Sequence, residues 1–206
     1  MKLEWLGHAC FALESGGWRI VIDPYQGVRG FGDVRTEAHQ VYCSHGHYDH
    51  AYRAGVAPLT GGVNPFTVRE VATFHDDQGG SARGENTIRI FTAEGLSVAH
   101  LGDLGHDLSA EQLAAVGPCD AVLLPVGGTY TIDAPAARAL LDRLRPRVAV
   151  PMHYRLGALG LENIGSLEDF LALCPPERVR RYEGNTLELT AETPEQVAVL
   201  TYRPGK

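Results

Sequence analysis

The segment over residues 44–50, Ser-His-Gly-His-Tyr-Asp-His, constrains this chain more than any other part of the sequence. It places three imidazoles and a carboxylate within six residues, directly after a short apolar run. His45 and His47 can point toward one ion, while Asp49 and His50 can turn toward a second ion nearby. A solvated histidine-rich loop or an expression scar is the alternative, but a scar would be terminal and contiguous. The spacing therefore predicts a dinuclear metal site.

The pattern His45-x-His47-x-Asp49-His50 resembles the HxHxDH signature of the metallo-β-lactamase superfamily. The resemblance is to a small branch that includes L-ascorbate-6-phosphate lactonase and metal-dependent hydrolases, and it covers about residues 1–155. Four flanking segments occur in the order seen in that branch: Leu6-Gly7-His8, Ile22-Asp23-Pro24, Gly102-Asp103 and Pro151-Met152-His153-Tyr154. The resemblance implies an α/β (α+β) fold, the four-layer αββα sandwich, with helices covering both outer faces.

The length and composition indicate one globular unit. The chain has 206 residues, of which 44% are hydrophobic and 21% are charged. That is enough for one sizeable core and short for two. Caps and apolar stripes predict short helices near residues 109–116, 133–145 and 166–174. We expect a single domain over residues 1–206, without the added domain of the superfamily's nucleases, because only 27 residues (48–74) separate His47 from His75.

The charge and the apolar runs exclude some partners. A formal net charge of −7, without any Lys/Arg run, disfavours binding to nucleic acid. The first five residues lack a secretory apolar segment, and no run reaches the roughly 18 apolar residues of a spanning helix. We expect a cytoplasmic protein with a small-molecule substrate and no membrane partner, and self-association stays open. The four cysteines are widely spaced, which favours buried free thiols over disulfides.

Several candidate site residues directly follow apolar segments that are predicted as strands. They are Asp23, His45, His75, Asp103, Gly127 and His153. Strand ends along one edge of packed sheets can hold a rigid site with many ligands. A carboxylate at such an end can hold a ligating histidine by its free ring nitrogen, and we expect this role for Asp23. His8 is expected to support the ligands in the same way.

The resemblance implies a complete ligand set for two divalent ions. It consists of His45, His47 and His75 on one ion, Asp49, His50 and His153 on the other, and Asp103 shared between them. An anion between the ions is needed because two cations a few ångström apart repel strongly. Imidazole-rich ligands favour zinc, and the carboxylates leave manganese, iron or nickel open.

Five residues are candidates for the chemistry or for binding the substrate. Asp49 can orient the nucleophile, and His106 can assist proton transfer. Arg83 can bind an anion, although a loop arginine is more often simply solvated. Gly128 and Tyr130 can form a substrate wall that offers a backbone N–H and a hydroxyl, although a glycine turn with a packed tyrosine is the commoner arrangement.

These residues together predict a metal-dependent hydrolase. Its nucleophile would be a metal-bridging hydroxide, and its substrate a small anionic ester, lactone or phosphoester. A non-hydrolytic metal-binding or redox protein on the same scaffold is the alternative. The diiron oxidoreductases of the superfamily have a pattern similar to His-x-Glu-x-Asp at this place, and His47 in place of the Glu argues against them. A nuclease is the second alternative.

Overall fold

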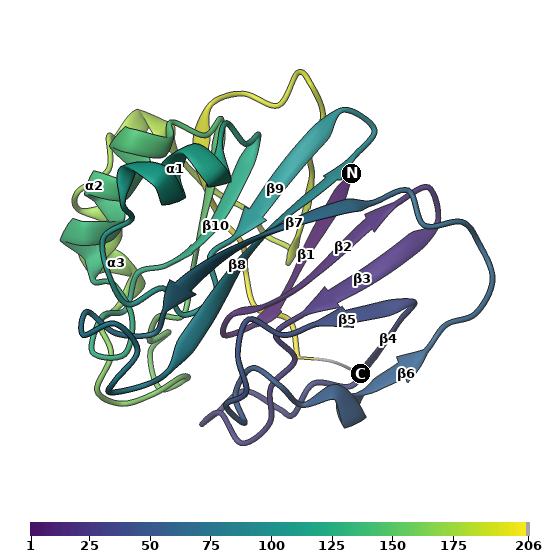
Figure 1. Ribbon diagram of the computed structural model, residues 1–206, viewed down its shortest axis with the longest axis horizontal. Coiled ribbons are helices and arrows are strands. Elements are labelled where there is room, and N and C mark those ends of the chain that lie inside the picture. Colours follow the sequence, from purple (N-terminus) through teal and green to yellow (C-terminus); the bar gives the residue numbers. More distant parts are fainter. Residues whose placement is uncertain (205–206) are drawn as a thin grey trace.

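Two large sheets face each other in the computed structural model, which describes residues 1–204 (Figure 1). The first sheet has five strands in the order β13-β1-β2-β3-β5. Its strands are β1 (Lys2–Gly7), β2 (Cys10–Ser15), β3 (Trp18–Ile22), β5 (Gln40–Tyr42) and β13 (Thr186–Glu188). The C-terminal part of the chain therefore contributes an edge strand to the N-terminal sheet.

The second sheet has seven strands in the order β12-β14-β11-β10-β9-β8-β7. They are β7 (Thr67–Phe74), β8 (Glu85–Ala93), β9 (Leu96–His100), β10 (Ala121–Pro125), β11 (Val148–Met152), β12 (Val179–Arg181) and β14 (Gln196–Val199). A further pair, β4 (Thr36–Ala38) and β6 (Val56–Pro58), forms a small parallel sheet. The layered arrangement of mixed α/β elements confirms the predicted fold class.

The core between the sheets follows from the alternation of side chains along the first three strands. Leu3 and Trp5 of β1 and Phe11 of β2 point into the main core. Cys10 and Ala12, the neighbours of Phe11, point to the opposite face. β10 and β11 are buried at every position, as expected for parallel strands covered on both sides.

Three α-helices lie on one side of the second sheet (Figure 1). They are α1 (Ala110–Val116), α2 (Ala134–Leu144) and α3 (Leu167–Leu171), and two 3₁₀ turns, η1 (Arg53–Gly55) and η2 (Pro176–Arg178), complete the helical structure of the described residues. Ser109 begins α1 with a capping box, and the Asp133 side chain caps α2. Both helices agree with the prediction, whereas α3 ends about one turn earlier than the expected residue 174.

The outer face of the first sheet is covered without an α-helix in the described part of the chain. Tyr25, Val28, Phe31 and Val34 of the loop after β3 pack there against Cys10 and its neighbours. That loop is rich in glycine and mixed charges and has no helical period, so its few large apolar side chains do the covering instead. The expectation of helices on both outer faces is corrected on this side.

The strand directions bring the ends of many strands to one edge. β9, β10 and β11 run parallel, and β7 runs the same way because β8 is antiparallel to both of its neighbours. In the first sheet, β3 and β5 are also parallel. The loops that leave these strands therefore gather at one edge of each sheet, where a multi-ligand site can form.

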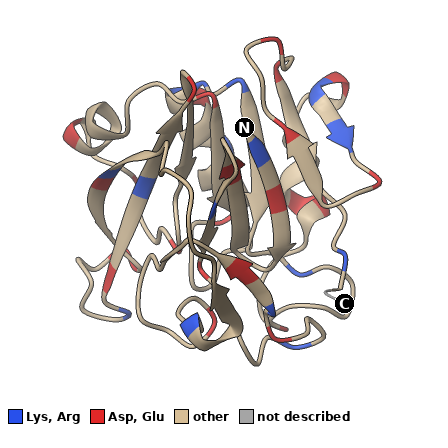
Figure 2. Ribbon diagram, turned by 90° about the vertical axis from the view of Figure 1, so that its right-hand side faces the viewer, with Lys and Arg blue, Asp and Glu red and all other residues tan. Residues whose placement is uncertain are grey.

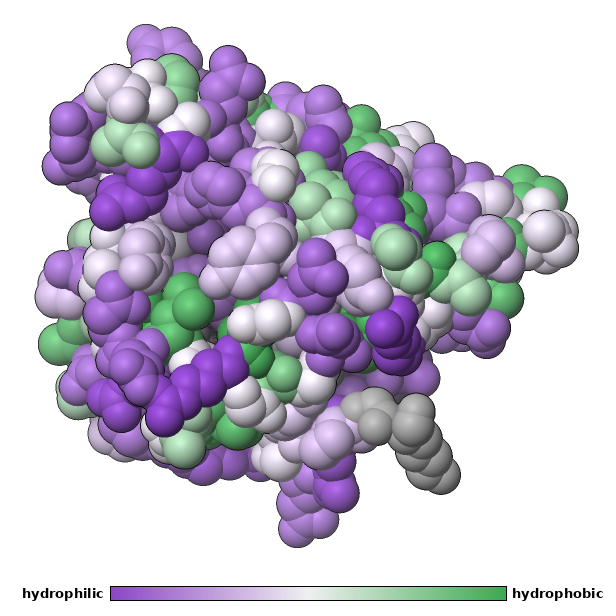
Figure 3. Space-filling view, turned by 90° about the horizontal axis from the view of Figure 1, so that it is seen from below, coloured by the Kyte–Doolittle hydropathy of each residue, from purple (hydrophilic) through white to green (hydrophobic). Residues whose placement is uncertain are grey.

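The surface carries interspersed charges. Figure 2 shows Lys and Arg scattered among Asp and Glu along the strands and loops that face the viewer. Seen from below, hydrophilic side chains cover most of the molecule, with hydrophobic residues between them (Figure 3). All four cysteines are free, as predicted, with Cys43 half-buried and the others buried. Within residues 1–204, no helix is long and apolar enough to cross a membrane.

Candidate metal centre

The first group of ligand-type side chains contains three histidines. His45 and His47 come from the loop after β5, and His75 directly follows β7. One ring nitrogen from each lies within 4.8 Å of the others. His75 Nδ1 donates a hydrogen bond to the carbonyl of Tyr130 at 2.9 Å, which leaves its Nε2 lone pair free to bind an ion.

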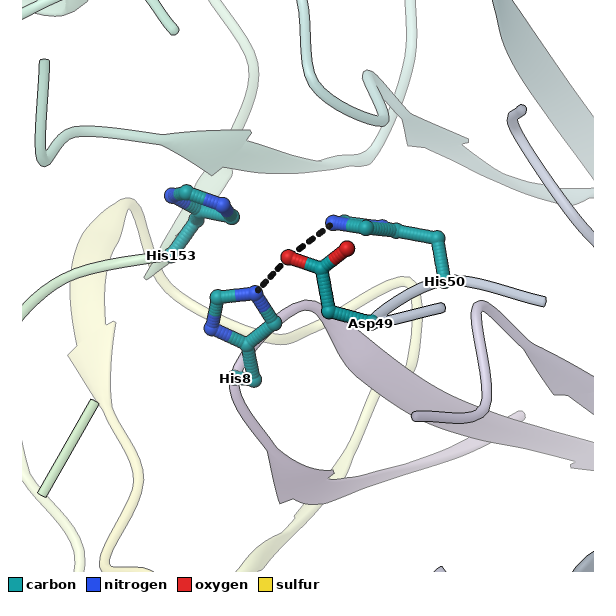
Figure 4. A group of neighbouring side chains, drawn as sticks. All are labelled: His8, Asp49, His50 and His153. Carbon is teal, nitrogen blue, oxygen red and sulfur yellow. Dashed lines mark ion pairs between the residues drawn. The ribbon is translucent and has the colours of Figure 1, made fainter. Parts of the chain in front are cut away.

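The second group consists of His8, Asp49, His50 and His153, all of them buried (Figure 4). Asp49 Oδ2 lies 3.5 Å from His8 Nε2 and 3.8 Å from His50 Nε2. Burial raises the pKa of the Asp49 carboxyl, but the neighbouring His8 and His50 outweigh burial and lower this pKa well below its usual range. Asp49 is therefore an anion that faces two imidazoles.

Asp103 lies between the two groups. Its Oδ2 is 3.3 Å from His75 Nε2, 3.2 Å from His50 Nε2 and 3.2 Å from His153 Nε2. Burial raises the pKa of this carboxyl, but His153 and His50 lower it well below the ordinary value. A single carboxylate oxygen thus contacts imidazoles of both groups.

Asp23 fixes two of the histidines from behind. Its Oδ2 accepts a hydrogen bond from His50 Nδ1 at 2.9 Å and another from Ser44 Oγ at 2.6 Å. Because the Ser44 hydroxyl donates its one hydrogen to Asp23, it can only accept from His45 Nδ1, which lies 2.9 Å away. The Nε2 atoms of His45 and His50 are then the nitrogens that can bind metal. Ser44 belongs to the motif segment, but its role was not predicted.

Asn86 and Gly102 position Asp103, and sequence reasoning missed both roles. Asn86 Oδ1 accepts a hydrogen bond from Asp103 N at 2.9 Å, while its Nδ2 donates to Thr73 and to the carbonyl of Leu101. Gly102 has φ +57°, and a Cβ at this position would lie 2.2 Å from Asn86 Oδ1. The turn that delivers Asp103 therefore requires glycine. An asparagine at a strand start gives no local signal of this contact.

The chemistry of the donors fits bound metal ions. Nε2 of His45, Nε2 of His50, both ring nitrogens of His153 and Oδ1 of Asp103 are buried without hydrogen-bond partners among the described residues. Buried polar atoms without partners are costly, and a coordinated ion would satisfy them. Burial also lowers the pKa of His45 to about 3. This histidine therefore stays neutral, which is the form that binds metal.

Two predicted site residues lie apart from this arrangement. His106 Nε2 accepts a hydrogen bond from the N–H of Phe74 at 3.1 Å, and its Nδ1 donates to the carbonyl of Asp107 at 2.7 Å. The N–H of Gly128 donates to the carbonyl of Ile132 at 3.2 Å. Both groups are thus engaged with the main chain, and neither residue lines the cavity over the histidines.

The other two predicted substrate-binding residues do line this cavity, which has a volume of about 350 Å³. Its lining residues are His47, Tyr48, Asp49, His75, Arg83, Asp103, Tyr130, His153 and Leu161. The Arg83 guanidinium lies over the Tyr130 ring, 5.5 Å from its centre, and the Tyr130 hydroxyl accepts a hydrogen bond from Asn163 Nδ2 at 2.6 Å. The candidate metal ligands therefore form the floor of the cavity, and Arg83 and Tyr130 form a cationic and aromatic wall.

Comparison with known proteins gives consistent matches. A Thermotoga maritima protein, assigned as a Zn-dependent hydrolase of the metallo-beta-lactamase superfamily, has a crystal structure with a TM-score of 0.77 and 38% identity, covering 98% of this chain and 99% of that one. A UPF0173 protein of Pyrococcus abyssi is 32% identical, over 82% of this chain and 89% of its own. A UPF0173 metal-dependent hydrolase of Carboxydothermus hydrogenoformans is 27% identical, over 82% and 91%.

The family assignment rests on the largest part of the chain. Residues 2–153, which hold every residue of both ligand groups, match the model of the beta-lactamase superfamily domain. The similarity to the Thermotoga maritima structure covers 98% of the chain. The chain therefore belongs to the beta-lactamase superfamily, among its metal-dependent hydrolases.

Proposed function

We propose that this protein is a dinuclear metal-dependent hydrolase of small anionic substrates. The three-histidine group would hold one ion, and Asp49, His50 and His153 the other. The observation that carries this proposal is the position of Asp103 Oδ2, about equally far from His75 of the first group and from His50 and His153 of the second. A buried anion at that point offsets the repulsion between two cations.

The side chains of the protein have separate roles in this proposal. Bound ions would supply a hydroxide near neutral pH and polarise the scissile carbonyl or phosphoryl group. Asp49 lines the cavity and is held as an anion, so it can accept a hydrogen bond from the nucleophile and keep it oriented. Asp23 fixes the tautomer of His50, which keeps the ligand atom aimed at the ion.

Zinc is the proposed metal. Five imidazoles belong to the ligand set, and borderline nitrogen ligands suit zinc. The Thermotoga maritima protein is assigned as Zn-dependent, and its sequence is 38% identical to that of this chain. The carboxylates Asp49 and Asp103 are also good ligands for manganese or iron, so the metal content of the purified protein must be measured.

The cavity supports a small substrate with an anionic group. Its volume of about 350 Å³ is near the lower end for ligand pockets. Arg83 offers a positive charge at one wall, while Tyr48, Tyr130 and Leu161 offer apolar surface. An ester, lactone or phosphoester would place its reacting group over the ions and its anionic group near Arg83.

The alternatives fit these features less well. A diiron redox protein of the resembling type would have Glu where this chain has His47, a residue that lines the cavity and belongs to the three-histidine group. A nuclease would need positive charge to neutralise phosphates along a strand. Arg83 is the one Lys or Arg in the cavity lining, and the net charge is −7.

A hydrolytic panel on metal-loaded protein tests the proposal. Protein purified without added metal is analysed for its elements, stripped, reloaded with Zn²⁺, Mn²⁺ or Fe²⁺, and assayed on matched carboxylic esters, lactones and phosphoesters with and without an anionic group. We expect metal-dependent hydrolysis that favours the anionic member of a pair, and Arg83→Ala should reduce this preference. Metal-loaded protein that hydrolyses none of the three classes but undergoes reversible redox cycling would support the redox alternative instead.

A further inference from the structure

His8 is a buried imidazole whose two ring nitrogens have no hydrogen-bond partner in the described structure. His100, which is equally buried, shows the ordinary solution: its Nε2 donates to the carbonyl of Ala9 at 2.9 Å, and its Nδ1 accepts from the N–H of Gly102 at 3.1 Å. An unsatisfied imidazole in the interior is unfavourable unless a ligand completes it. His8 therefore requires a partner that the protein chain does not supply.

The surroundings of His8 identify that partner as a cation. One ligand-type atom from His8 lies within 4.8 Å of the corresponding atoms of Asp49, His50 and His153. His8 Nε2 is 3.5 Å from Asp49 Oδ2, a length at which a hydrogen bond is weak, and the His8 ring centre is 4.2 Å from that of His153. In Figure 4 the four side chains converge on the space around the Asp49 carboxylate.

The backbone at His8 is built to hold the ring in this place. His8 has φ +50°, a left-handed conformation that a non-glycine residue adopts only when its surroundings impose it. Its carbonyl accepts hydrogen bonds from Trp5 Nε1 at 3.0 Å and from His153 N at 3.3 Å. The second bond ties the main chain at His8 directly to another residue of the same group. His153 shares the left-handed conformation, with φ +52°.

From these contacts, we propose that His8 is a protein ligand of the second ion rather than a support behind the ligands. This inference rests on the proposed two-ion site. The second subsite then offers four buried donors, whereas the first offers three imidazoles, of which His47 is exposed. Asp103 is shared by both subsites, so the second subsite has one protein donor more than the first, and all of its donors are buried. The second ion is therefore the tightly held one, and the first is the exchangeable one.

Cobalt titration of metal-free protein tests this assignment, because visible absorption and competition with a chromophoric chelator report on each ion separately. His8→Leu removes the donor and keeps an apolar side chain in the space. It should weaken the affinity for the tightly held second ion, which binds first in the titration, by more than about 100-fold. The loss of a ligand lowers metal affinity more than the 10–100-fold that is typical of residues behind the ligands. His47→Leu should instead weaken the affinity for the exchangeable ion and leave the cobalt spectrum of the tightly held ion unchanged.

His39→Leu is the matched control. It removes a half-buried imidazole that stacks on Trp18 at 4.3 Å and is absent from every ligand group of the described residues. Both cobalt affinities and both spectra should equal those of the wild type. If His8→Leu does not fold, His8→Gln decides the question. Weaker binding of the tightly held ion with a shifted cobalt spectrum supports the proposal, and wild-type affinity and spectrum overturn it.

The outcomes separate this inference from the proposed function. In His8→Leu, an affinity for the tightly held ion that stays within about 100-fold of the wild type, with an unchanged cobalt spectrum, would overturn the assignment of His8, because that range is typical of a residue behind the ligands. The two-ion hydrolase would then stand, provided that the wild type still binds two ions. Wild-type protein that binds one ion or none would remove both proposals.

Discussion

Asp103 is the residue on which the two halves of the site depend. Its carboxylate contacts histidines that come from three separate loops, and it has Gly102 before it because no Cβ fits there. The local spacing of HxHxDH predicted from sequence that the side chains of this motif gather at one site, and the fold brings them into the two groups. The supports Ser44 and Asn86 were not predictable, because their contacts arise only when two sheets meet in the correct register.

Asp103→Ala and His106→Ala distinguish the proposed shared ligand from a nearby histidine. Asp103→Ala removes the anion between the ions, so at least the weaker ion should be lost together with activity, because charge repulsion is no longer offset. His106→Ala should leave both metals bound, because its ring bonds to the main chain at Phe74 and Asp107, and turnover should fall by about 100-fold or less. Metal content decides: if His106→Ala loses an ion while Asp103→Ala keeps both, the ligand set is wrong.

At the scale of elements, the loop after β7 carries Arg83, which lines the cavity over the histidines. Asp76 organises this loop, because its two carboxylate oxygens accept hydrogen bonds from the N–H groups of Gln78, Gly80, Ala82 and Arg83 at 2.7–2.9 Å. Burial raises the pKa of Asp76, but these N–H groups outweigh burial and lower it to about 2. The loop is therefore held by an anion at any pH at which the protein is assayed.

Asp76→Ala should loosen the loop and move Arg83 without removing a metal ligand. We expect KM for an anionic substrate to rise about 10-fold, as for the loss of one charged contact, while metal content stays at the wild-type level. His75 keeps its own bond to the carbonyl of Tyr130 in this variant. Arg83→Ala is the matched comparison and should show a similar KM. If Asp76→Ala instead lost an ion with KM unchanged, the loop would serve the metal rather than the substrate.

Sequence patterns predicted the elements that have a clear period or cap and failed where tertiary contacts decide. The capping box at Ser109 and the apolar stripe of α2 are local signals, and both helices form as expected. The cover over the first sheet depends on where Tyr25 and Phe31 land after a glycine-rich turn. No periodic pattern in the sequence predicts these contacts. The expectation of a helix there came from the resemblance to the family alone.

At the scale of the whole molecule, the second sheet is tied together by a network around Asp120. This carboxylate accepts hydrogen bonds from Arg147 Nη2 at 2.6 Å and from the N–H and hydroxyl of Ser97, so it joins the starts of β9, β10 and β11. Arg147 Nη1 also donates to the carbonyls of Thr190, Ala191 and Thr193. The network lies outside the metal site, which makes it a test of fold stability alone.

Asp120→Asn should lower the free energy of unfolding near pH 7 by about 1–2 kcal/mol. Burial raises the pKa of Asp120, but the bonds from Arg147 and Ser97 outweigh burial and lower it. A carboxyl whose folded pKa is depressed stabilises the protein above its unfolded pKa, near 3.9, and this contribution is lost as the pH falls through the folded value. Urea unfolding at pH 7 and below pH 4 checks this. A difference between wild type and variant that grew toward acid would contradict it.

The single domain expected over residues 1–206 and the specificity for a lactone or phosphoester stay predictions at this scale. The assignment to metal-dependent hydrolases holds independently of both. Beyond that assignment, we propose a two-ion centre in which each ion has its own ligand group and both share one carboxylate.

Metal stoichiometry tests that centre most directly. Metal-free protein is titrated with Zn²⁺, unbound ions are removed, and zinc and protein are quantified together by elemental analysis and amino-acid analysis. We expect saturation at about two ions per chain, with about one ion per chain in Asp103→Ala. Saturation of the wild type at one ion, at every zinc concentration that keeps the protein folded, would contradict the shared-carboxylate centre.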